Sequence, residues 1–327
     1  MIRAAVIGTG YLGKFHAEKY AKSANAELVA VVDSEPGVAK TIAKKYRTKA
    51  MTDYRELLDL GIQCVSVASV TSSHFGITKW LLENGIDVLV EKPMCVTLEE
   101  GAELIRCAEE NQRILQVGHL ERFNPAFREM RKVLTKPWFF EVRRIAPFTG
   151  RGADVDVVLD LMIHDIDIVT HLVGEPVERI DAVGIPVLTD QVDIANARLV
   201  FQGGAIANVS ASRAAFASER TIRIFQPELY ISLDFGKKRL KICTKGEGKD
   251  LLGFPRIDVT ERTVEERDAL ADEIESFIRC VTNRTAPEVT GADGLRALQL
   301  ATRIKAAFRE GMEKMLPENP EAVRAVL

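Results

Sequence analysis

The sequence has few of the features that mark secreted, membrane or disulfide-stabilised proteins. Its five cysteines are an odd number, lie far apart and never form a Cys-x-x-Cys pair, so we expect buried, reduced thiols. The first residues enter a short apolar run directly and lack the basic region, long apolar stretch and cleavage site of a signal peptide. No later apolar run is long enough to cross a membrane. These absences predict a cytoplasmic protein.

Charge of one sign is also scarce. The net charge is −3, from 44 basic and 47 acidic residues among 327. This balance argues against general binding to nucleic acid or to an anionic membrane, and it leaves a small molecule as the expected partner. Internal repeats and low-complexity tracts are lacking too, apart from a polar tail from Pro317. A chain of this length usually folds as two domains.

The first 119 residues alternate short apolar runs with helix-compatible segments. We expect buried strands at 4–7, 27–32, 64–68, 87–90 and 114–117, and helices at 14–23, 38–46, 54–60, 74–84 and 98–111. Such alternation predicts an α/β fold with a parallel, doubly wound sheet and helices on both faces. Residues 1–119 are therefore expected to form a Rossmann domain, and residues 120–327 a second domain.

A glycine-rich turn, Gly8-Thr9-Gly10-Tyr11-Leu12-Gly13, joins the first strand to the first helix. Gly8 permits a tight turn, Gly10 lets the main chain approach a pyrophosphate, and Gly13 lets the helix pack close to the strand. The helix N-terminus adds unpaired N–H groups and the positive end of the helix dipole. Such a pattern alone is weak evidence, but its place between a strand and a helix predicts that this turn binds a dinucleotide.

Asp33 ends the second strand at the distance expected of the acid that binds the adenosine ribose. Its carboxylate can accept hydrogen bonds from both ribose hydroxyls, but it would repel the 2′-phosphate of NADP. The next residues are Ser34 and Glu35, and not the arginine that would bind the 2′-phosphate of NADP. The sequence therefore predicts NAD as the cofactor. Without the glycine turn, Asp33 would be read as a solvated strand-end carboxylate.

Glu91-Lys92-Pro93 follows the fourth of these strands. Ligands of open parallel sheets bind beyond the carboxyl ends of the strands, which is where Lys92 must lie. Taken alone, the tripeptide favours an ordinary surface lysine. Its position makes Lys92 a candidate for contact with a ligand.

The order of elements changes from about Phe139. Strand-like runs at 194–201, 205–211, 221–225, 229–234 and 240–243 predict an α/β domain with an open, mostly antiparallel sheet, and 266–282 and 292–314 are expected to be helices over one face. The segment 144–154 is expected to be a mobile loop that covers the substrate. An open sheet also favours burial against a partner subunit, which predicts a homodimer or homotetramer.

One long, mostly apolar helix is expected over 155–172, and it carries a polar stripe. Asp160, His164, Asp167 and His171 recur on a single face of that helix. Buried charges are costly unless they are paired or face a wet cavity, so the stripe is a structural network, a metal site or the lining of an active-site cleft. A metal is disfavoured because the spacing is not specific for zinc and no cysteine lies nearby. In a cleft, His164 would suit proton removal from an alcohol, with Asp160 beside it.

The glycine turn, Asp33, Glu91-Lys92-Pro93 and Asp160-x-x-x-His164 occur in the order and rough spacing of the Gfo/Idh/MocA oxidoreductases, which the chain resembles over nearly its whole length. The resemblance implies a nicotinamide at the domain junction and a sugar, inositol, sugar acid or nucleotide sugar as substrate. It also implies a catalytic trio. By this resemblance His164 is the usual proton acceptor, Lys92 lies near the substrate hydroxyl and the nicotinamide, and Asp160 contacts the substrate. Glu91 is expected to join the cofactor-binding residues.

Residues 117–125 and 158–167 resemble the branch of this family that oxidises the 3-hydroxyl of UDP-N-acetylglucosamine and feeds a 3-amino sugar pathway for lipid A. His119 is expected to bind substrate, and Arg122 is the best candidate to bind its diphosphate. Leu161 replaces a common family glycine, and many relatives lack His119, so the substrate contacts general to sugar dehydrogenases of the family are not carried over to this chain. Further cations considered for the diphosphate are Arg143, Arg144, Arg151 and Arg213.

The sequence leaves three alternative functions open. The first is an NAD-dependent glycosidase that oxidises C3 transiently and then returns the hydride. The second is a dehydrogenase of a free sugar or an inositol. The third is a non-enzymatic regulator that senses NAD, which the presence of all three catalytic-type residues disfavours.

Overall fold

The computed structural model describes residues 1–150, 155–249, 252–264 and 267–315. The chain forms two compact units, Met1–Phe123 with Arg267–Arg296 and Asn124–Glu266 with Ala297–Leu327. The predicted single boundary after residue 119 misses the return of the chain to the first unit. The reason is that one amphipathic helix from the C-terminal third completes the core of that unit.

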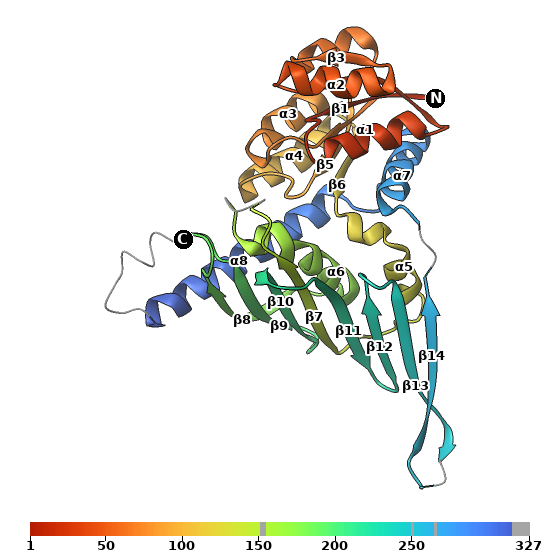
Figure 1. The fold of residues 1–327 in the computed structure, drawn as a ribbon, viewed down its shortest axis with the longest axis vertical. Coiled ribbons are helices and arrows are strands. Elements are labelled where there is room, and N and C mark those ends of the chain that lie inside the picture. The colour runs from red at the N-terminus through yellow and green to blue at the C-terminus, as the bar shows by residue number, and fades with distance from the viewer. Residues whose placement is uncertain (151–154, 250–251, 265–266, 316–327) are drawn as a thin grey trace. The chain divides into compact units, whose positions relative to one another are not determined.

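The first unit contains a six-stranded parallel sheet (Figure 1). Its spatial order is β3-β2-β1-β4-β5-β6, which is the order of a dinucleotide-binding fold. The predicted Rossmann fold is confirmed; only the three-residue strand β3 is missing from the prediction. The strands are β1 (Ile2–Ile7), β2 (Ala26–Val32), β3 (Lys49–Met51), β4 (Cys64–Val67), β5 (Asp87–Glu91) and β6 (Leu115–Gly118).

Helices cover both faces of this sheet (Figure 1). One face is covered by α1 (Gly13–Lys22) and α7 (Ala269–Asn283), whose Ala17, Tyr20 and Phe277 join a core with Val6 and Leu89. The other face is covered by α3 (Thr71–Glu83) and α4 (Leu98–Glu110). Three further elements are α2 (Pro36–Tyr46) and the 3₁₀ helices η1 (Tyr54–Leu60) and η2 (Leu120–Phe123).

The second unit contains an eight-stranded sheet in the order β14-β13-β12-β11-β7-β10-β9-β8. Only β7 and β10 pair in parallel, so the mostly antiparallel sheet is confirmed. The strands are β7 (Phe139–Pro147), β8 (Val177–Ile185), β9 (Ile194–Phe201), β10 (Ile206–Ala215), β11 (Glu219–Gln226), β12 (Leu229–Asp234), β13 (Arg239–Lys249) and β14 (Pro255–Thr263).

The expected mobile loop from residue 144 is wrong in its first part. Residues 144–147 belong to β7, a central strand that is held by β10 and β11 on either side. The remainder of the proposed loop includes 151–154, which lie outside the described residues.

Helices pack against one face of this second sheet (Figure 1). They are α5 (Pro125–Arg131), the π-helix η3 (Val158–Met162), α6 (Ile163–Val173) and α8 (Gly291–Met315), which starts in the first unit. From Ala297 onward, α8 places Ala301, Ile304 and Phe308 in the core, at the spacing of an amphipathic helix. The opposite face of the sheet carries no helix among the described residues.

All five cysteines are free, and four are buried while Cys243 is half-buried. The expectation of buried thiols is therefore confirmed except at Cys243, which lies on the open face of the sheet. No helix of the described residues combines the length and the apolar character needed to cross a membrane.

Candidate active site

The glycine turn closes the carboxyl end of β1 in the way its three glycines require. Gly8 has a φ of 79°, and a Cβ on it would lie 2.5 Å from the Cα of Ser69. A Cβ on Gly13 would lie 1.7 Å from the carbonyl oxygen of Gly8. Around Gly10, by contrast, a Cβ would meet no atom within 4 Å. The outer two glycines make the turn possible, and Gly10 leaves its outer surface clear.

The N-terminus of α1 lies directly behind the turn. No side chain caps it, and its first turn holds no acidic residue. Tyr11 is exposed and Leu12 is half-buried, so both are at the surface of the turn. A helix N-terminus without a side-chain cap, the positive end of the helix dipole and a surface without a Cβ together fit a pyrophosphate.

Asp33 follows β2 and braces the same turn. Its Oδ2 accepts hydrogen bonds from the main-chain N–H of Thr9 at 2.8 Å and from the Thr9 hydroxyl at 3.2 Å, and its Oδ1 accepts from the main-chain N–H of Glu35 at 3.0 Å. The side chain is half-buried, and carboxylate oxygens have further lone pairs for hydroxyl donors. This place fits the ribose-binding role, which stays a prediction for the residue itself.

Lys92 follows β5 at the carboxyl edge of the sheet, as predicted, and its neighbour Glu91 points inward. The Glu91 carboxylate accepts from Nε2 of His16 at 3.0 Å and from the main-chain N–H of Lys92 at 3.2 Å. Burial works to raise the pKa of Glu91, but the hydrogen bond and charge of His16 and the charge of Lys92 outweigh it, so the pKa is lowered. The described contacts of Glu91 are thus internal to the protein.

His119 and Arg122 lie after β6 and are both buried, with 1% and 5% of their surfaces exposed. The Arg122 guanidinium lies 3.5 Å from Oδ1 of Asp293, at the start of α8. Burial works to raise the pKa of Asp293, but hydrogen bonds from Thr290 and the charge of Arg122 lower it overall. The two predicted substrate contacts are therefore interior residues of the first unit, and their contact with substrate stays a prediction.

The helix that carries the polar stripe starts later than predicted, and its first turn is a π-helix. Asp156 caps the start of this helix, because its Oδ1 accepts hydrogen bonds from the main-chain N–H groups of Val158 and Leu159, both at 3.0 Å. The π-turn then runs over Val158–Met162 and passes into α6 at Ile163. The long helix predicted over 155–172 is found over residues 157–173, and only its start and its first turn differ from the prediction. Isolated π-turns are frequent at functional sites.

Asp160 lies on the π-turn and His164 on the first turn of α6, and both are half-buried. Asp167 is 1% exposed and therefore lies inside the second unit. His171 lies beside Phe127, with ring centroids 6.3 Å apart. Of the predicted stripe, Asp160, His164 and His171 are half-buried, and Asp167 is buried. Lys92 belongs to the first unit.

Each described arginine that was considered for the diphosphate has a carboxylate partner. Arg144 forms two hydrogen bonds with Asp165, at 2.8 and 2.9 Å, and both residues are buried. Arg143 is exposed beside Glu219. Arg122 has Asp293, as described above, and Arg151 lies outside the described residues.

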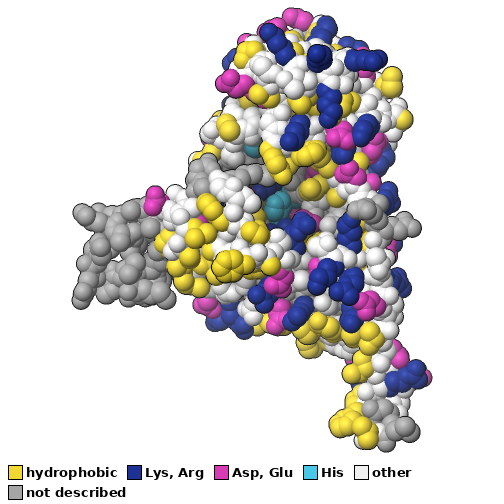
Figure 2. Space-filling model, viewed as in Figure 1, with side chains coloured by type: hydrophobic (Ala, Val, Ile, Leu, Met, Phe, Trp, Pro, Cys, Tyr) yellow, Lys and Arg dark blue, Asp and Glu magenta, His cyan; other side chains and the backbone are white. Residues whose placement is uncertain are grey.

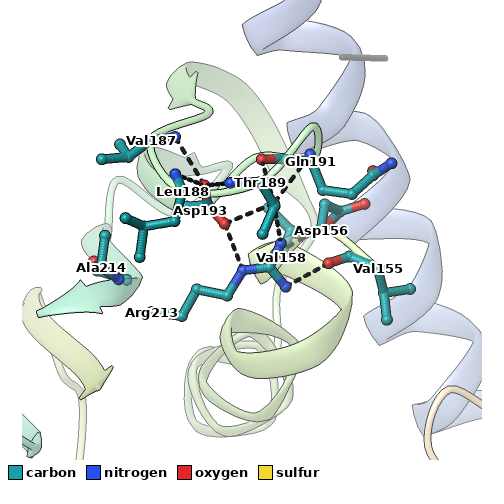
Figure 3. A network of polar contacts seen from close by, with 11 residues as sticks. Val155, Asp156, Val158, Val187, Leu188, Thr189, Gln191, Asp193, Arg213 and Ala214 are labelled. Atoms are coloured by element: carbon teal, nitrogen blue, oxygen red, sulfur yellow. Dashed lines mark hydrogen bonds and ion pairs between the residues drawn. The ribbon is translucent and has the colours of Figure 1, made fainter. Parts of the chain in front are cut away.

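Arg213 is the centre of a buried network in the second unit (Figure 3). Its guanidinium donates to Oδ1 of Asp193 at 2.6 Å and to the carbonyl oxygen of Val155 at 2.6 Å. Oδ2 of Asp193 accepts from the main-chain N–H groups of the loop before it, at Val187, Leu188 and Thr189. Arg213 thus ties two segments together, which is a structural role that sequence alone did not indicate.

A hollow of about 720 Å³ lies at the edge of the first sheet where the strands begin, opposite the edge that carries the glycine turn and Lys92. It is lined by Arg113 and Leu115 at the start of β6, by Arg284 after α7, and by Gly291 of α8. The amino ends of parallel strands are not where cofactors bind in such sheets. Among the described residues, no three His, Cys, Asp or Glu side chains gather as they would around a metal ion.

Two family models match the chain. Residues 2–119 match the oxidoreductase family with an NAD-binding Rossmann fold, and residues 128–231 match the C-terminal domain of the same GFO/IDH/MocA family. The chain belongs to the GFO/IDH/MocA oxidoreductases. Its first unit is an NAD-binding Rossmann domain, which confirms the predicted fold, the enzyme class that the resemblance implied and NAD as the cofactor.

Individual relatives agree with this assignment. The chain is 36% identical over 315 residues to the UDP-N-acetylglucosamine 3-dehydrogenase of Acidithiobacillus ferrooxidans, covering 96% of this oxidoreductase and 99% of the relative. A crystal structure of that enzyme matches with a TM-score of 0.88 over 94% of this chain and 97% of the other. The scyllo-inositol 2-dehydrogenase (NAD(+)) of Bacillus subtilis is 27% identical, with 96% of each chain covered.

Sequence reasoning missed several residues that shape the site. His16 and His74 are buried beside the strand ends of the first unit, and Asp156 starts the π-turn of the second. His16 lies three residues after Gly13, which was the one available signal. A buried histidine in a helix has no sequence pattern that separates it from an exposed one.

Proposed function

We propose that this oxidoreductase oxidises the 3-hydroxyl of UDP-N-acetylglucosamine to a 3-keto sugar. The observation that carries the proposal is the 36% identity to the Acidithiobacillus enzyme over nearly the full length of both chains. Lys92, Asp160 and His164 are all present at positions that fit the catalytic trio. The glycine turn and Asp33 would hold NAD, which supplies the hydride acceptor.

In this proposal the chain's own residues handle the proton of the hydroxyl group. His164 accepts it as general base, because a neutral imidazole binds a proton near neutral pH. The ammonium group of Lys92 stabilises the negative charge that develops on the oxygen. Asp160, at the half-buried π-turn before His164, contacts the substrate.

The diphosphate of the substrate needs a cation that can leave its present partner. The four described arginines that were considered for it already have carboxylate partners. If Arg122 binds the diphosphate, it must exchange Asp293 for it. Arg122→Lys would then raise the KM for UDP-sugars, because lysine cannot form the same two-pronged contact.

We further propose a homo-oligomer that forms through the open face of the second sheet, in the cytoplasm. Free cysteines suit a reducing compartment. The 3-keto product would be the precursor of a 3-amino sugar for lipid A. An inositol or a free sugar is the second candidate substrate, which the 27% identity to the Bacillus inositol dehydrogenase favours.

The test is NADH formation across UDP-sugars, free sugars and inositols. We expect turnover of UDP-N-acetylglucosamine and a deuterium isotope effect with its 3-deuterated form. Net NADH would also exclude a glycosidase that returns its hydride. His164→Ala should lower kcat by about 10²–10⁴-fold, the usual contribution of a general base. Turnover of inositols alone, or near-normal kcat in His164→Ala, would contradict the proposal.

A further inference from the structure

The main chain at Lys92 is held from the α1 and α7 face of the sheet. Oε2 of Glu91 accepts from the N–H of Lys92, and Oε1 of the same carboxylate accepts from Nε2 of His16 on α1. His16 has no exposed surface, and Glu91 is 8% exposed. An ionised carboxylate can only accept hydrogen bonds, so His16 must donate through Nε2–H. The two contacts link α1 to the residue that follows β5.

The neighbouring strand leaves room for this carboxylate. Gly118 of β6 pairs with Glu91 of β5, so both residues face the same side of the sheet. A Cβ on Gly118 would lie 3.0 Å from the carboxyl carbon of Glu91 and 3.1 Å from each of its oxygens. The φ of Gly118 is not in the left-handed region. Space for Glu91 is therefore the structural reason for glycine here.

A second buried histidine contacts the chain on the other side of Lys92. His74 of α3 is 1% exposed; its Nδ1 lies 2.9 Å from the carbonyl oxygen of Pro93, and its Nε2 lies 3.0 Å from that of Ser69. Burial lowers the pKa of His74, so its imidazole is neutral at pH 7 and has a single N–H to donate. Because α1 and α3 lie on opposite faces of the sheet, the Lys92 segment has a histidine on each side.

We propose that His16 and His74 are positioning residues for Lys92, His16 through Glu91 and His74 through the carbonyl group of Pro93. The inference rests on the proposed function, because that is where Lys92 acts on the substrate. It replaces the expectation that Glu91 binds the cofactor. Placement of a reacting group matters because an error of about 1 Å can cost about 10²-fold in rate.

A third buried group, Glu273, bears on which carboxyl of this layer is charged. Glu273 of α7 has no exposed surface, and neither of its carboxyl oxygens has a hydrogen-bond partner among the described residues. Burial and the negative charge of Glu91 raise the pKa of Glu273 well above its usual range. Two neighbouring carboxyls in a dry layer do not both ionise. Glu91 carries the charge, because it has the donors.

The first test compares His16→Leu with His16→Gln, whose amide nitrogen takes the place of Nε2. Exchange of the Lys92 amide hydrogen is measured by NMR or fragmentation mass spectrometry, together with kcat, KM and NAD affinity. We expect faster exchange and a kcat lower by about 10²-fold in His16→Leu, partial recovery of both in His16→Gln, and unchanged NAD affinity.

Tyr20→Phe is the matched control. Tyr20 lies on the same helix and is fully buried, but its hydroxyl forms its hydrogen bond with Ser66 of β4, at 3.0 Å, and not with Glu91 or the Lys92 segment. It should lower the melting temperature without changing Lys92 exchange or kcat. If Tyr20→Phe lowers kcat as much as His16→Leu, the effect is general loosening of the layer, and the proposal is overturned.

The second test separates the two contacts of His74. An asparagine amide nitrogen takes the place of Nδ1, and a glutamine amide nitrogen takes the place of Nε2. His74→Asn keeps the donor to Pro93 and should retain kcat, whereas His74→Gln should lose it. The reverse result would mean that His74 holds Ser69, which overturns its part in positioning Lys92.

The outcomes also separate this inference from the proposed function. A wild type that oxidises no sugar would refute the function, and Lys92 exchange in the His16 variants would still decide whether the residue is held. Faster exchange with unchanged kcat would refute positioning while the dehydrogenase activity stands. A large loss of NAD affinity in Glu91→Gln, with Lys92 exchange unchanged, would return Glu91 to the cofactor.

Discussion

Two buried carboxyls in one layer of the first unit have opposite properties. Glu91 has His16 and a main-chain N–H to accept from, and its pKa is lowered. Glu273 has no hydrogen-bond partner among the described residues, and its pKa is raised. At the scale of single residues, hydrogen-bond donors therefore decide which carboxyl is charged, because both side chains are buried.

The raised pKa of Glu273 predicts a pH-dependent cost. The folded protein binds the carboxyl proton of Glu273 more tightly than the unfolded chain does. The protonated carboxyl therefore stabilises the fold at low pH, and this contribution is lost as the pH rises above about 4.3, the pKa of glutamate in the unfolded chain. Glu273→Gln has no proton to lose. The melting temperature of the variant relative to wild type should therefore be higher at pH 8 than at pH 5.

Thermal unfolding of both proteins at the two pH values measures this effect. Tyr20→Phe, which changes no charge in this range, should shift the melting temperature equally at both. A Glu273→Gln difference that does not depend on pH would show that Glu273 is ionised in the folded protein.

Asp33 allows a charge test at the cofactor turn. Asp33→Asn keeps an acceptor for the N–H of Thr9 but removes the negative charge. Two charges about 4 Å apart near a surface repel by about 1–4 kcal/mol, so its loss should narrow the preference for NAD over NADP by about tenfold or more. Fluorescence titration with both dinucleotides measures the ratio. The exposed neighbour Glu35, changed to Gln, is the control, and a ratio that moves equally in both variants would contradict a specific role of Asp33.

At the scale of elements, pattern and turn chemistry predicted most of the first unit. Continuous apolar runs located β1, β2, β4, β5 and β6 within a residue or two of their ends. The strands missed in the second unit have mixed patterns. All nine residues of β14 are exposed, so no buried side dictates an alternation, and β7 has two adjacent arginines in its middle that resemble a polar loop.

The π-turn is a further element that periodicity could not predict. A repeat of polar residues at helical spacing does not distinguish a regular α-helix from one that starts with a wider turn. Asp156 sets the start, and its effect depends on two N–H groups and on the ammonium group of Lys305, 2.6 Å from Oδ2. That ion pair spans much of the sequence and has no local signature.

Asp156 should therefore control both stability and the site. Asp156→Ala removes the cap and should lower the free energy of unfolding by about 0.5–2 kcal/mol, measured by urea titration. Because Asp160 lies on the capped turn, kcat should fall as well. Asp156→Asn keeps the acceptor but loses the ion pair with Lys305, and should recover part of the activity. Wild-type kcat in Asp156→Ala would show that the π-turn forms without its cap.

At the scale of the whole molecule, each of the two units is built from two separate stretches of the chain, and each unit carries some of the candidate site residues. The sequence predicted two domains but not the return of α7, because an amphipathic helix shows that it buries one face and not which core receives it. The same limit applies to the open face of the second sheet. The strand-like runs predicted a sheet with one open face, but only the order of the strands shows which residues lie next to one another on that face.

One row across that face is apolar. Cross-strand pairing places Ile206, Phe139, Phe225, Tyr230 and Cys243 side by side, and the rings of Phe139, Phe225 and Tyr230 lie within 5.6 Å of their neighbours, centroid to centroid. Beside it are exposed ion pairs such as Glu141 with Arg223 and Lys241 with Glu261. Figure 2 shows basic, acidic and hydrophobic side chains interspersed over the strands of this unit. An aromatic centre with a charged surround is typical of protein interfaces.

The proposed oligomer therefore depends on the aromatic row. Phe225→Arg puts a charge at its centre, where a second copy would have to bury it without a partner, and such a charge opposes association strongly. Light scattering after size exclusion should show a wild-type dimer or tetramer that Phe225→Arg converts to a smaller species across a range of concentrations. Leu58→Arg is the control, because Leu58 is an exposed leucine, at 43%, on the first unit. If the wild type is a monomer at micromolar concentration, or if both variants dissociate alike, the open face is not the interface between subunits.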